Sequence, residues 1–446
     1  EFAPPSMTDS SVHLTELMRT SGPEITRNAS RVHGIGSQES YAGFITVNET
    51  NNNNMFFWYF PAKNGNATAP LLMWLQGGPG GSSMFGLFAE NGPLQVDAQL
   101  KVSERAITWN NEYAMIFVDN PVGAGFSYTD TDEGYATNER DVARDLYSLL
   151  QQFYAIFPEQ QKNEFYVTGE SYGGHYCPAI SYKIHVENQA IVAGESEGIV
   201  INLAGVAIGD GWIDPIIQLQ GYPELFFNLG LADQNEVEVI RNYVRESTQA
   251  IEQKRWLDAF KSWDEFLNGD VYPYPTYVYN ITGSLNYDNF LLTVDPPSFS
   301  YYPKYLNQPA VREAIHVGTH AFQDGHNCEM HLLEDFMKSL KYELSVLMDN
   351  YKVLIYSGQL DVIIAGALTE LFLPTVQWSG QHEYQNAQKT VWKVKSSDVE
   401  VAGFVRNVKQ FTQVIVRTAG HILPHDQPER AMDMITRFVE GRSFVN

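Results

Sequence analysis

Short apolar runs recur along the chain and predict buried β-strands. The runs are LLMWLQ (71–76), AMIFVDN (114–120), EFYVTG (164–169), VINLAGVAIGD (200–210), KVLIYSG (352–358) and TQVIVRT (412–418). Runs that are apolar throughout, without alternation, are typical of strands covered on both faces. Nearer the start, SYAGFITVN and MFFWYFPA flank the Asn-rich segment 51–54 and predict a β-hairpin.

Segments with helical periodicity lie between these strands. Residues 138–157 repeat apolar positions at helical spacing, and Asn138 stands where an N-cap is expected. Residues 427–441 predict a closing helix with Pro428 in its first turn. Because strands and helices alternate, we expect an α/β fold with a mostly parallel central sheet flanked by helices on both faces.

The alternation of strands and helices stops between about 214 and 310, and this change marks the predicted boundaries of an insertion. This region begins with a long amphipathic stretch, one helix or a helical pair, and continues with turn-rich aromatic sequence. We interpret 214–310 as an insertion that caps the sheet, and 41–213 with 311–446 as the core. Residues 1–40 are polar and turn-rich and predict an irregular N-terminal arm.

The charge balance narrows the classes of partner. The 446 residues include 29 basic and 53 acidic side chains, a formal net charge of −24. This balance argues against nucleic acids and anionic membranes as main partners. An excess of acidic side chains ordinarily serves solubility. The more specific interpretation is that the protein works in an acidic compartment, where protonation discharges many of these carboxylates. No apolar run approaches the roughly 18–20 residues of a membrane span, and no signal peptide is visible, so we expect a cytosolic or an already processed chain.

The segment 169–173, Gly-Glu-Ser-Tyr-Gly, matches the G-x-S-x-G pattern of a nucleophile elbow. An apolar strand precedes it and a helical stretch follows, which is the context that the turn requires. A serine nucleophile needs a base, and the base needs an orienting carboxylate. Asp361 and His421 follow two later strands in the order expected after Ser171, and each lies just past a strand end. His425 is a competing base deeper in the same loop.

A tetrahedral intermediate needs backbone N–H donors. Tyr172, directly after the serine, supplies one in this interpretation. The glycine-rich WLQGGPGGSS (74–83) supplies the other, with Gly78 as the candidate. A phosphate-binding loop is the alternative, and we discount it because neither a Walker lysine nor a G-x-G-x-x-G pattern follows.

Five motifs together resemble the serine carboxypeptidases. They are WLQGGPGGSS, DNPVGAGFSY, GESYGG, SGQLD and AGHILPHDQP, in the order and spacing of that family, and the resemblance covers about residues 40–440. The sequence segments SYAGFITVN, FFWYFPA and RAMDMI resemble those of the family's vitellogenic carboxypeptidase-like branch. The resemblance implies an α/β-hydrolase core with a helical cap insertion. It also implies acid-active removal of single C-terminal amino acids from peptides, no metal and no cofactor.

The resemblance also assigns the site. Ser171, Asp361 and His421 match the catalytic positions, and Gly78 and Tyr172 the oxyanion-hole donors. The positions that hold the substrate's terminal carboxylate are matched by Gln76, Gly77, Glu90 and Glu170, with Trp74 lining the site. Two facing carboxyl groups cannot both ionise cheaply, so one keeps its proton in acid and can bind a carboxylate.

Three departures from the family pattern matter. Gln76 stands where an asparagine is usual, so its longer side chain must retract or bind differently. Gly81 and Ile364 replace cysteines that some members carry. The chain contains only two cysteines, Cys177 and Cys328, and the sequence leaves open whether they pair. We interpret Cys177 as a small buried residue on the helix that follows the elbow.

Sequons at Asn28, Asn48, Asn66 and Asn280 permit glycosylation. With the resemblance, they favour the secretory pathway, as a secreted, lysosomal or vacuolar protein. Peptides with a free C-terminus are the expected partners, and monomer and homodimer both remain open.

Three other interpretations compete. The residues His316, His320, His326, Cys328 and His331 cluster in sequence, but their spacing matches no closed zinc site. An esterase or acyltransferase would use the same triad, because fold does not fix function. A non-enzymatic stabilising partner could keep the fold. Preference for a free C-terminus over an amide or ester discriminates among these classes.

Overall fold

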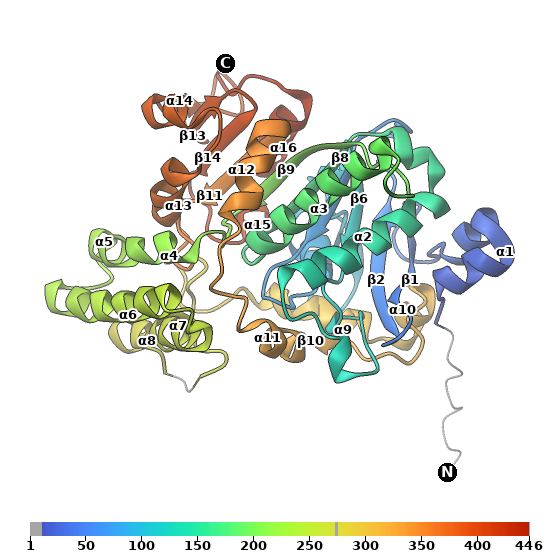
Figure 1. The fold of residues 1–446 in the computed structure, drawn as a ribbon, viewed down its shortest axis with the longest axis horizontal. Coiled ribbons are helices and arrows are strands. Elements are labelled where there is room, and N and C mark those ends of the chain that lie inside the picture. Colours follow the sequence, from blue (N-terminus) through green and yellow to red (C-terminus); the bar gives the residue numbers. More distant parts are fainter. Residues whose placement is uncertain (1–10, 273–274, 446) are drawn as a thin grey trace, which may run out of the picture.

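The central feature of the computed structural model, which describes residues 11–272 and 275–445, is a ten-stranded sheet. Its order is β1-β2-β6-β3-β8-β9-β11-β14-β13-β12 (Figure 1). The strands from β6 to β14 run parallel, and antiparallel pairs close both edges. Their bounds are β1 Tyr41–Asn48, β2 Asn53–Phe60, β3 Leu71–Leu75, β6 Ala114–Val118, β8 Phe165–Glu170, β9 Leu203–Gly209, β11 Lys352–Gly358, β12 Thr390–Trp392, β13 Gly403–Val408 and β14 Phe411–Val416.

All six predicted core strands and the β1–β2 hairpin are confirmed. Side chains alternate along each strand, so one sheet carries two separate apolar cores. In β3, Met73 belongs to one core and Trp74 to the other, and both are fully buried. This explains why the parallel strands are apolar throughout and show no alternation of apolar and polar residues.

Helices cover both faces, as the alternation of elements predicts. The first core includes residues of α2 (Glu139–Ile156), α3 (Gly173–Ala193), α12 (Lys341–Asn350) and α13 (Gly366–Phe372). The second includes residues of the π-helix η1 (Gly86–Glu90), α9 (Tyr301–Leu306), α10 (Pro309–Ala314) and α16 (Pro428–Glu440). Asn138 caps α2 by accepting from the N–H groups of Arg140 and Asp141, and Pro428 opens α16.

The insertion contains helices and no strand among its described residues. Its helices are α4 (Pro215–Gln218), α5 (Tyr222–Asn228), α6 (Gln234–Glu252), α7 (Trp256–Trp263) and α8 (Tyr277–Thr282), followed by α9. The long amphipathic stretch is a helical pair, α6 and α7, and Asp233 with Glu236 forms a capping box at the start of α6. In Figure 1, α4 to α8 project to the left of the sheet, whereas α9 lies apart from them. The domain boundaries at 214 and 310 remain predictions.

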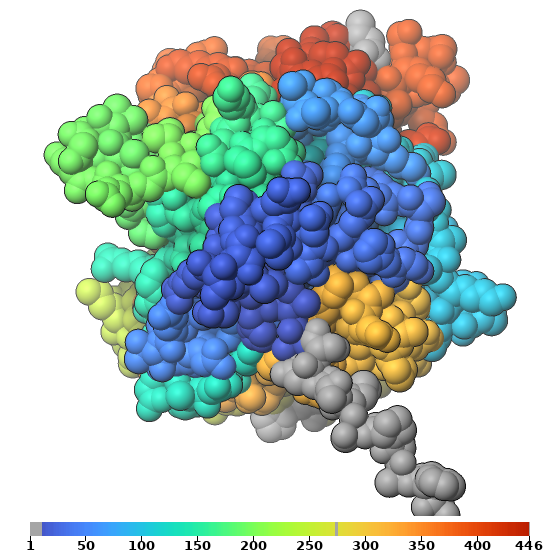
Figure 2. Space-filling view, turned by 90° about the vertical axis from the view of Figure 1, so that its right-hand side faces the viewer, coloured from blue at the N-terminus to red at the C-terminus, as the bar shows by residue number. Residues whose placement is uncertain are grey.

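The expectation of an irregular arm over 1–40 is wrong for part of its length. Residues Leu14–Ala29 form helix α1, kinked at Gly22 where φ is 77°. The Gly22–Pro23 break interrupts the helical period and hides it in the sequence. Val12 N–H donates to His316 O at 3.0 Å, and Figure 2 shows this dark-blue segment spread over the surface beside the amber segment near residue 316. Residues 1–10 lie outside the described part.

The remaining strands and α-helices of the described ranges are short. They are β4 (Leu94–Val96) with β5 (Val102–Glu104), β7 (Ala124–Gly125) with β10 (Gln323–Asp324), α11 (His326–Leu332), α14 (Gln381–Asn386) and α15 (Leu423–Asp426). None of the helices within the described ranges combines the length and apolar character needed to cross a bilayer.

Candidate active site

Ser171 lies on a sharp turn between β8 and α3. Its φ of 60° is in the left-handed region, which a non-glycine residue adopts only under constraint. Two hydrogen bonds hold the turn: Ser171 N–H donates to Gly209 O, and Ser171 O accepts from Trp212 N–H, both at 3.0 Å. The predicted elbow therefore has the strained backbone that exposes a side chain at the carboxyl end of the sheet.

Asp361 and His421 meet although 60 residues separate them. His421 Nδ1 lies 2.9 Å from Asp361 Oδ2, and both side chains are buried. The other oxygen of Asp361 accepts from Ile364 N–H at 3.2 Å. The two residues follow β11 and β14, which are parallel neighbours, so the sheet brings the two loops to one edge.

The pKa of His421 reflects its acidic surroundings. Burial lowers this pKa, but the charge of Asp361 and its hydrogen bond oppose burial, and Asp288 and Glu90 add smaller contributions. The net result raises the pKa of His421 to about 9. The effect of Glu90 indicates that the imidazole lies near the carboxyl groups described below.

His425 is engaged elsewhere. Its Nδ1 lies 2.9 Å from Ala89 O, and its ring packs edge-on against Phe299 of the insertion. The neighbouring Asp426 accepts from Gly420 N–H at 2.7 Å and so braces the loop that carries His421. Of the two candidate bases, His421 is the one paired with a carboxylate.

The glycine-rich loop packs directly on the elbow. A Cβ on Gly77 would lie 2.6 Å from Ser171 Cβ and 2.7 Å from Tyr172 N, so only glycine fits there. Further along the loop, Ser82 Oγ donates to the buried Asp119 at 2.6 Å. Burial raises the pKa of Asp119 to about 7, although this side chain accepts several hydrogen bonds. These contacts place both predicted N–H donors, Gly78 and Tyr172, in adjoining backbone segments.

Four buried side chains form a chain of contacts beside the serine. Trp74 Nε1 donates to Gln76 Oε1 at 2.9 Å, and Gln76 Nε2 donates to Glu170 Oε1 at 2.8 Å. The longer Gln76 side chain has thus retracted against Trp74, one of the two outcomes expected from its length. Glu90 completes the group from the end of η1, and its two carboxylate oxygens have no hydrogen-bond donor.

The pKa values of both Glu90 and Glu170 are raised. Burial raises the pKa of Glu90 to about 7, although Glu170 and Gln76 interact favourably with its charged form. Burial, together with the charge of Glu90, holds the pKa of Glu170 well above its usual range. Two buried carboxyl groups in contact avoid a double charge, and a proton held between them supplies the missing donor.

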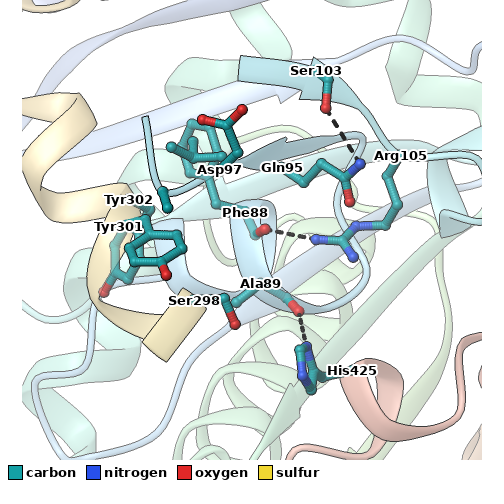
Figure 3. Close-up of a pocket in the computed structure, with 12 residues that line it drawn as sticks. Phe88, Ala89, Gln95, Asp97, Ser103, Arg105, Ser298, Tyr301, Tyr302 and His425 are labelled. Carbon is teal, nitrogen blue, oxygen red and sulfur yellow. Dashed lines mark hydrogen bonds between the residues drawn. The ribbon is translucent and has the colours of Figure 1, made fainter. Parts of the chain in front are cut away.

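A cavity of about 400 Å³ is bordered by Phe88 and Ala89 of η1 and by His425 (Figure 3). Arg105 borders it and donates to Phe88 O at 2.6 Å and to Gly92 O at 3.1 Å. These bonds fix the turn around Glu90, and the guanidinium favours the ionised form of Glu90. None of the three predicted catalytic residues lines this cavity, so it adjoins the site without being the catalytic cleft.

One acidic residue of the site escaped the sequence interpretation. Asp210 follows β9, between the strands that carry Ser171 and Asp361, and is completely buried. Among the described residues, Asp210, Asp361 and His421 are the only group of three whose possible ligand atoms lie within 4.8 Å of one another. A signal was available, since Asp361 was assigned as an acid in the turn after an apolar strand, and Asp210 follows the apolar strand β9.

The histidine-rich segment 316–331 does not converge on a single point. His316 Nε2 bonds to Arg31 O, His320 stacks on Tyr128, and His331 contacts Asp132. Cys177 and Cys328 are buried free thiols, so the open question of their pairing is answered for this structure. Cys177 lies on α3, as predicted.

An elbow serine and a buried Asp–His pair, at one edge of a mostly parallel sheet, define an α/β-hydrolase. Comparison with known proteins narrows this class. The family model described as serine carboxypeptidase, peptidase S10, matches residues 32–441, and the chain belongs to this family. It is a serine-type carboxypeptidase, as the resemblance implied.

Two relatives confirm the resemblance to the vitellogenic carboxypeptidase-like branch. A human protein named "Probable serine carboxypeptidase CPVL" is 50% identical, over 92% of this chain and 84% of the relative. "Vitellogenic carboxypeptidase" of Aedes aegypti is 40% identical, over 95% of this chain and 89% of the relative. The crystal structure of Kex1(Δ)p, a prohormone-processing carboxypeptidase of Saccharomyces cerevisiae, shares the fold. It superposes with a TM-score of 0.76 at 24% identity, covering 91% of this chain and 92% of that one.

Proposed function

We propose that this carboxypeptidase is acid-active and releases single C-terminal amino acids through an acyl-enzyme on Ser171. The observation that carries this proposal is the buried Gln76–Glu170–Glu90 group one residue from the nucleophile. In acid both glutamates are protonated, so one proton can lie between them while the other is a donor for the substrate's terminal carboxylate. Binding that carboxylate directly beside Ser171 leaves room for one residue beyond the scissile bond, which makes the enzyme an exopeptidase.

His421 is the general base and Asp361 its orienting carboxylate. His421 takes the proton of Ser171 Oγ while the oxygen attacks the last peptide carbonyl, and then gives the proton to the leaving amine. Asp361 accepts from Nδ1–H and so presents Nε2 as the basic nitrogen. The N–H groups of Gly78 and Tyr172 stabilise the oxyanion. Water, activated by the same imidazole, then hydrolyses the acyl-enzyme.

The acidic preference follows from the carboxyl pair, whereas the protonation of His421 opposes it. His421 must be neutral to accept a proton, and nearby negative charge opposes this. Burial raises the pKa of Asp288 to about 6 and that of Glu90 to about 7. Protonation of both in acid removes two of the charges that hold the imidazolium. Acidification therefore loads the carboxylate site and lowers the pKa of His421 by these smaller contributions, while the larger contribution of Asp361 remains.

The test is hydrolysis of an N-blocked dipeptide and of its C-terminal amide from pH 4 to 8. Cleavage of the free acid, strongest in acid and abolished by Ser171→Ala, is the expected result. Circular dichroism and thermal unfolding of the variant serve as the control for folding. Equal cleavage of acid and amide would remove the carboxylate site from the mechanism, and a fully active Ser171→Ala would remove the nucleophile.

We also place the enzyme in the secretory pathway, as a secreted, lysosomal or vacuolar glycoprotein. The sequons at Asn28, Asn66 and Asn280 are exposed, which supports their use. Asn48 is half-buried, and its side-chain oxygen accepts from Thr50 N–H and Asn51 N–H. We expect intact mass before and after enzymatic deglycosylation to show glycans at the three exposed sites and least at Asn48. An unmodified protein secreted from a eukaryotic host would refute this assignment.

A further inference from the structure

Asp210 is held firmly at the carboxyl end of β9. Its φ is 44°, in the left-handed region, and its N–H donates to Tyr356 O at 2.8 Å. Its Oδ1 accepts from Gly358 N–H at 2.8 Å, on the turn that leads to Asp361. The backbone and one side-chain oxygen are therefore both tied to β11, and only Oδ2 is left to interact with the site.

Oδ2 of Asp210 faces other acids. It has no hydrogen-bond donor, and the carboxyl group lies within 4.8 Å of Asp361 and His421 in the fully buried group described above. An unpaired charge beside a second carboxylate in a dry interior is strongly unfavourable. A protonated Asp210 removes the second charge and also gives Asp361 a further hydrogen-bond donor.

We propose that Asp210 is a positioning residue that keeps a proton and donates it to Asp361, which holds the Asp361 carboxylate against the His421 imidazole. This inference rests on the proposed triad and adds a member behind it. In this role Asp210 does not touch substrate. It limits the rotation of Asp361 and keeps a second negative charge away from the imidazole.

The electrostatics of the surroundings support a neutral Asp210. Burial raises its pKa well above the usual range, and the charge of Asp361 adds to the effect. The titratable groups that face it from the packed elements are Asp361 and Tyr356 from β11 and its loop, His421 after β14, Glu170 from β8 and Asp288 from the insertion. Ionised Asp210 would strengthen the hold on the imidazolium and weaken His421 as a base.

Asp210→Asn is the decisive variant, because asparagine is neutral at every pH and keeps both a donor and the acceptor for Gly358. We expect kcat within about threefold of wild type and an unchanged acidic limb of kcat/KM, since wild-type Asp210 is already uncharged. A tenfold or larger loss of kcat, or an acidic limb that moves to lower pH by about one unit, would show that Asp210 acts as an anion and would overturn the proposal.

Asp210→Ala removes the donor and is the contrasting variant. We expect kcat to fall at least tenfold with KM nearly unchanged, and the low-field proton resonance of His421 Nδ1–H to shift or broaden. Asp210→Asn should keep this resonance, which separates positioning from general stability. An unchanged resonance and kcat in Asp210→Ala would overturn the proposal. If Asp210→Ala does not fold, Asp210→Asn alone decides. Loss of activity in Ser171→Ala tests the triad itself, independently of either variant.

Discussion

Replacement of both site glutamates by glutamine, Glu90→Gln with Glu170→Gln, tests the origin of the acidic preference. The two side chains keep their size and hydrogen-bonding capacity but lose their titration. In the wild-type protein, burial raises the pKa of Glu90 to about 7, so the pair is neutral below this pH and charged above it. Above pH 7 the remaining proton is held between the two glutamates, so only the neutral pair has a proton to offer to a substrate carboxylate.

The size of the effect follows from that pKa. If binding requires the protonated pair, the neutral fraction falls to about one hundredth two pH units above 7. Repulsion between unit charges about 4 Å apart, at an effective dielectric constant of about 20, is about 4 kcal/mol, or nearly a thousandfold. The repulsion is large enough that the charged pair does not bind substrate measurably up to about pH 9. The preference for the free acid over the amide therefore follows the neutral fraction, and we expect it to be about a hundredfold lower at pH 9 than at pH 7.

The assay is the ratio of kcat/KM for an N-blocked dipeptide to that for its amide, from pH 4 to 9. Titration of His421 affects both substrates and cancels in this ratio. The wild-type ratio should fall about tenfold per pH unit above 7, and the double variant should give a flat ratio. Each single variant keeps one carboxyl group and an alkaline limb, displaced from that of the wild type. A double variant with the wild-type pH dependence would refute the reasoning.

Three further predictions follow from packing and burial. Gly77→Ala places a methyl group 2.6 Å from Ser171 Cβ, so we expect at least a hundredfold loss of kcat and about 1–3 kcal/mol of stability, measured by kinetics and thermal unfolding; wild-type activity would contradict the close approach. Arg105→Met removes a charge that lowers the pKa of Glu90, so the alkaline limb of the substrate ratio should move to higher pH, whereas Arg105→Lys should leave it in place; movement to lower pH would contradict the assignment. Burial raises the pKa of Glu329 to about 9, so its contribution to stability is complete below the unfolded-state pKa of about 4.5 and is lost as pH rises toward 9, at up to about 1.4 kcal/mol per pH unit. Glu329→Gln should therefore raise the melting temperature at pH 7.5 and leave it nearly unchanged at pH 4.5; equal shifts at both pH values would exclude proton linkage.

The parallel strands of the fold were predictable because their sequence and their environment agree. Strands such as β3 and β6 are covered on both faces, so every residue is apolar and the run stands out. The edge strands β12 and β13 were missed. β13 alternates buried and less buried positions, and β12 has only three residues. Helix α1 was missed because Gly22 breaks its period.

The residues of the candidate site also divide into those that local sequence predicted and those that it did not. The elbow and the loops carrying Asp361 and His421 are local features, each a strand followed by a turn with one chemical group, so motif spacing located them. The family resemblance supplied Glu90 and Gln76, which no local pattern marks. Asp210 carried the same local signal as Asp361, but nothing in the sequence said which acids would share a buried space.

The sequence by itself determined the elements whose cause lies within a few residues: apolar strands, the capped helix α2, the strained Ser171 turn and the order of nucleophile, acid and base. Tertiary structure decided which of these groups interact. Glu90 meets Glu170 across 80 positions of sequence, Asp210 meets Asp361 across 151, and Arg105 reaches the turn that carries Glu90. The physical reason is that pKa values depend on distance and on exclusion of water, and both are fixed only when the sheet brings its loops to one edge.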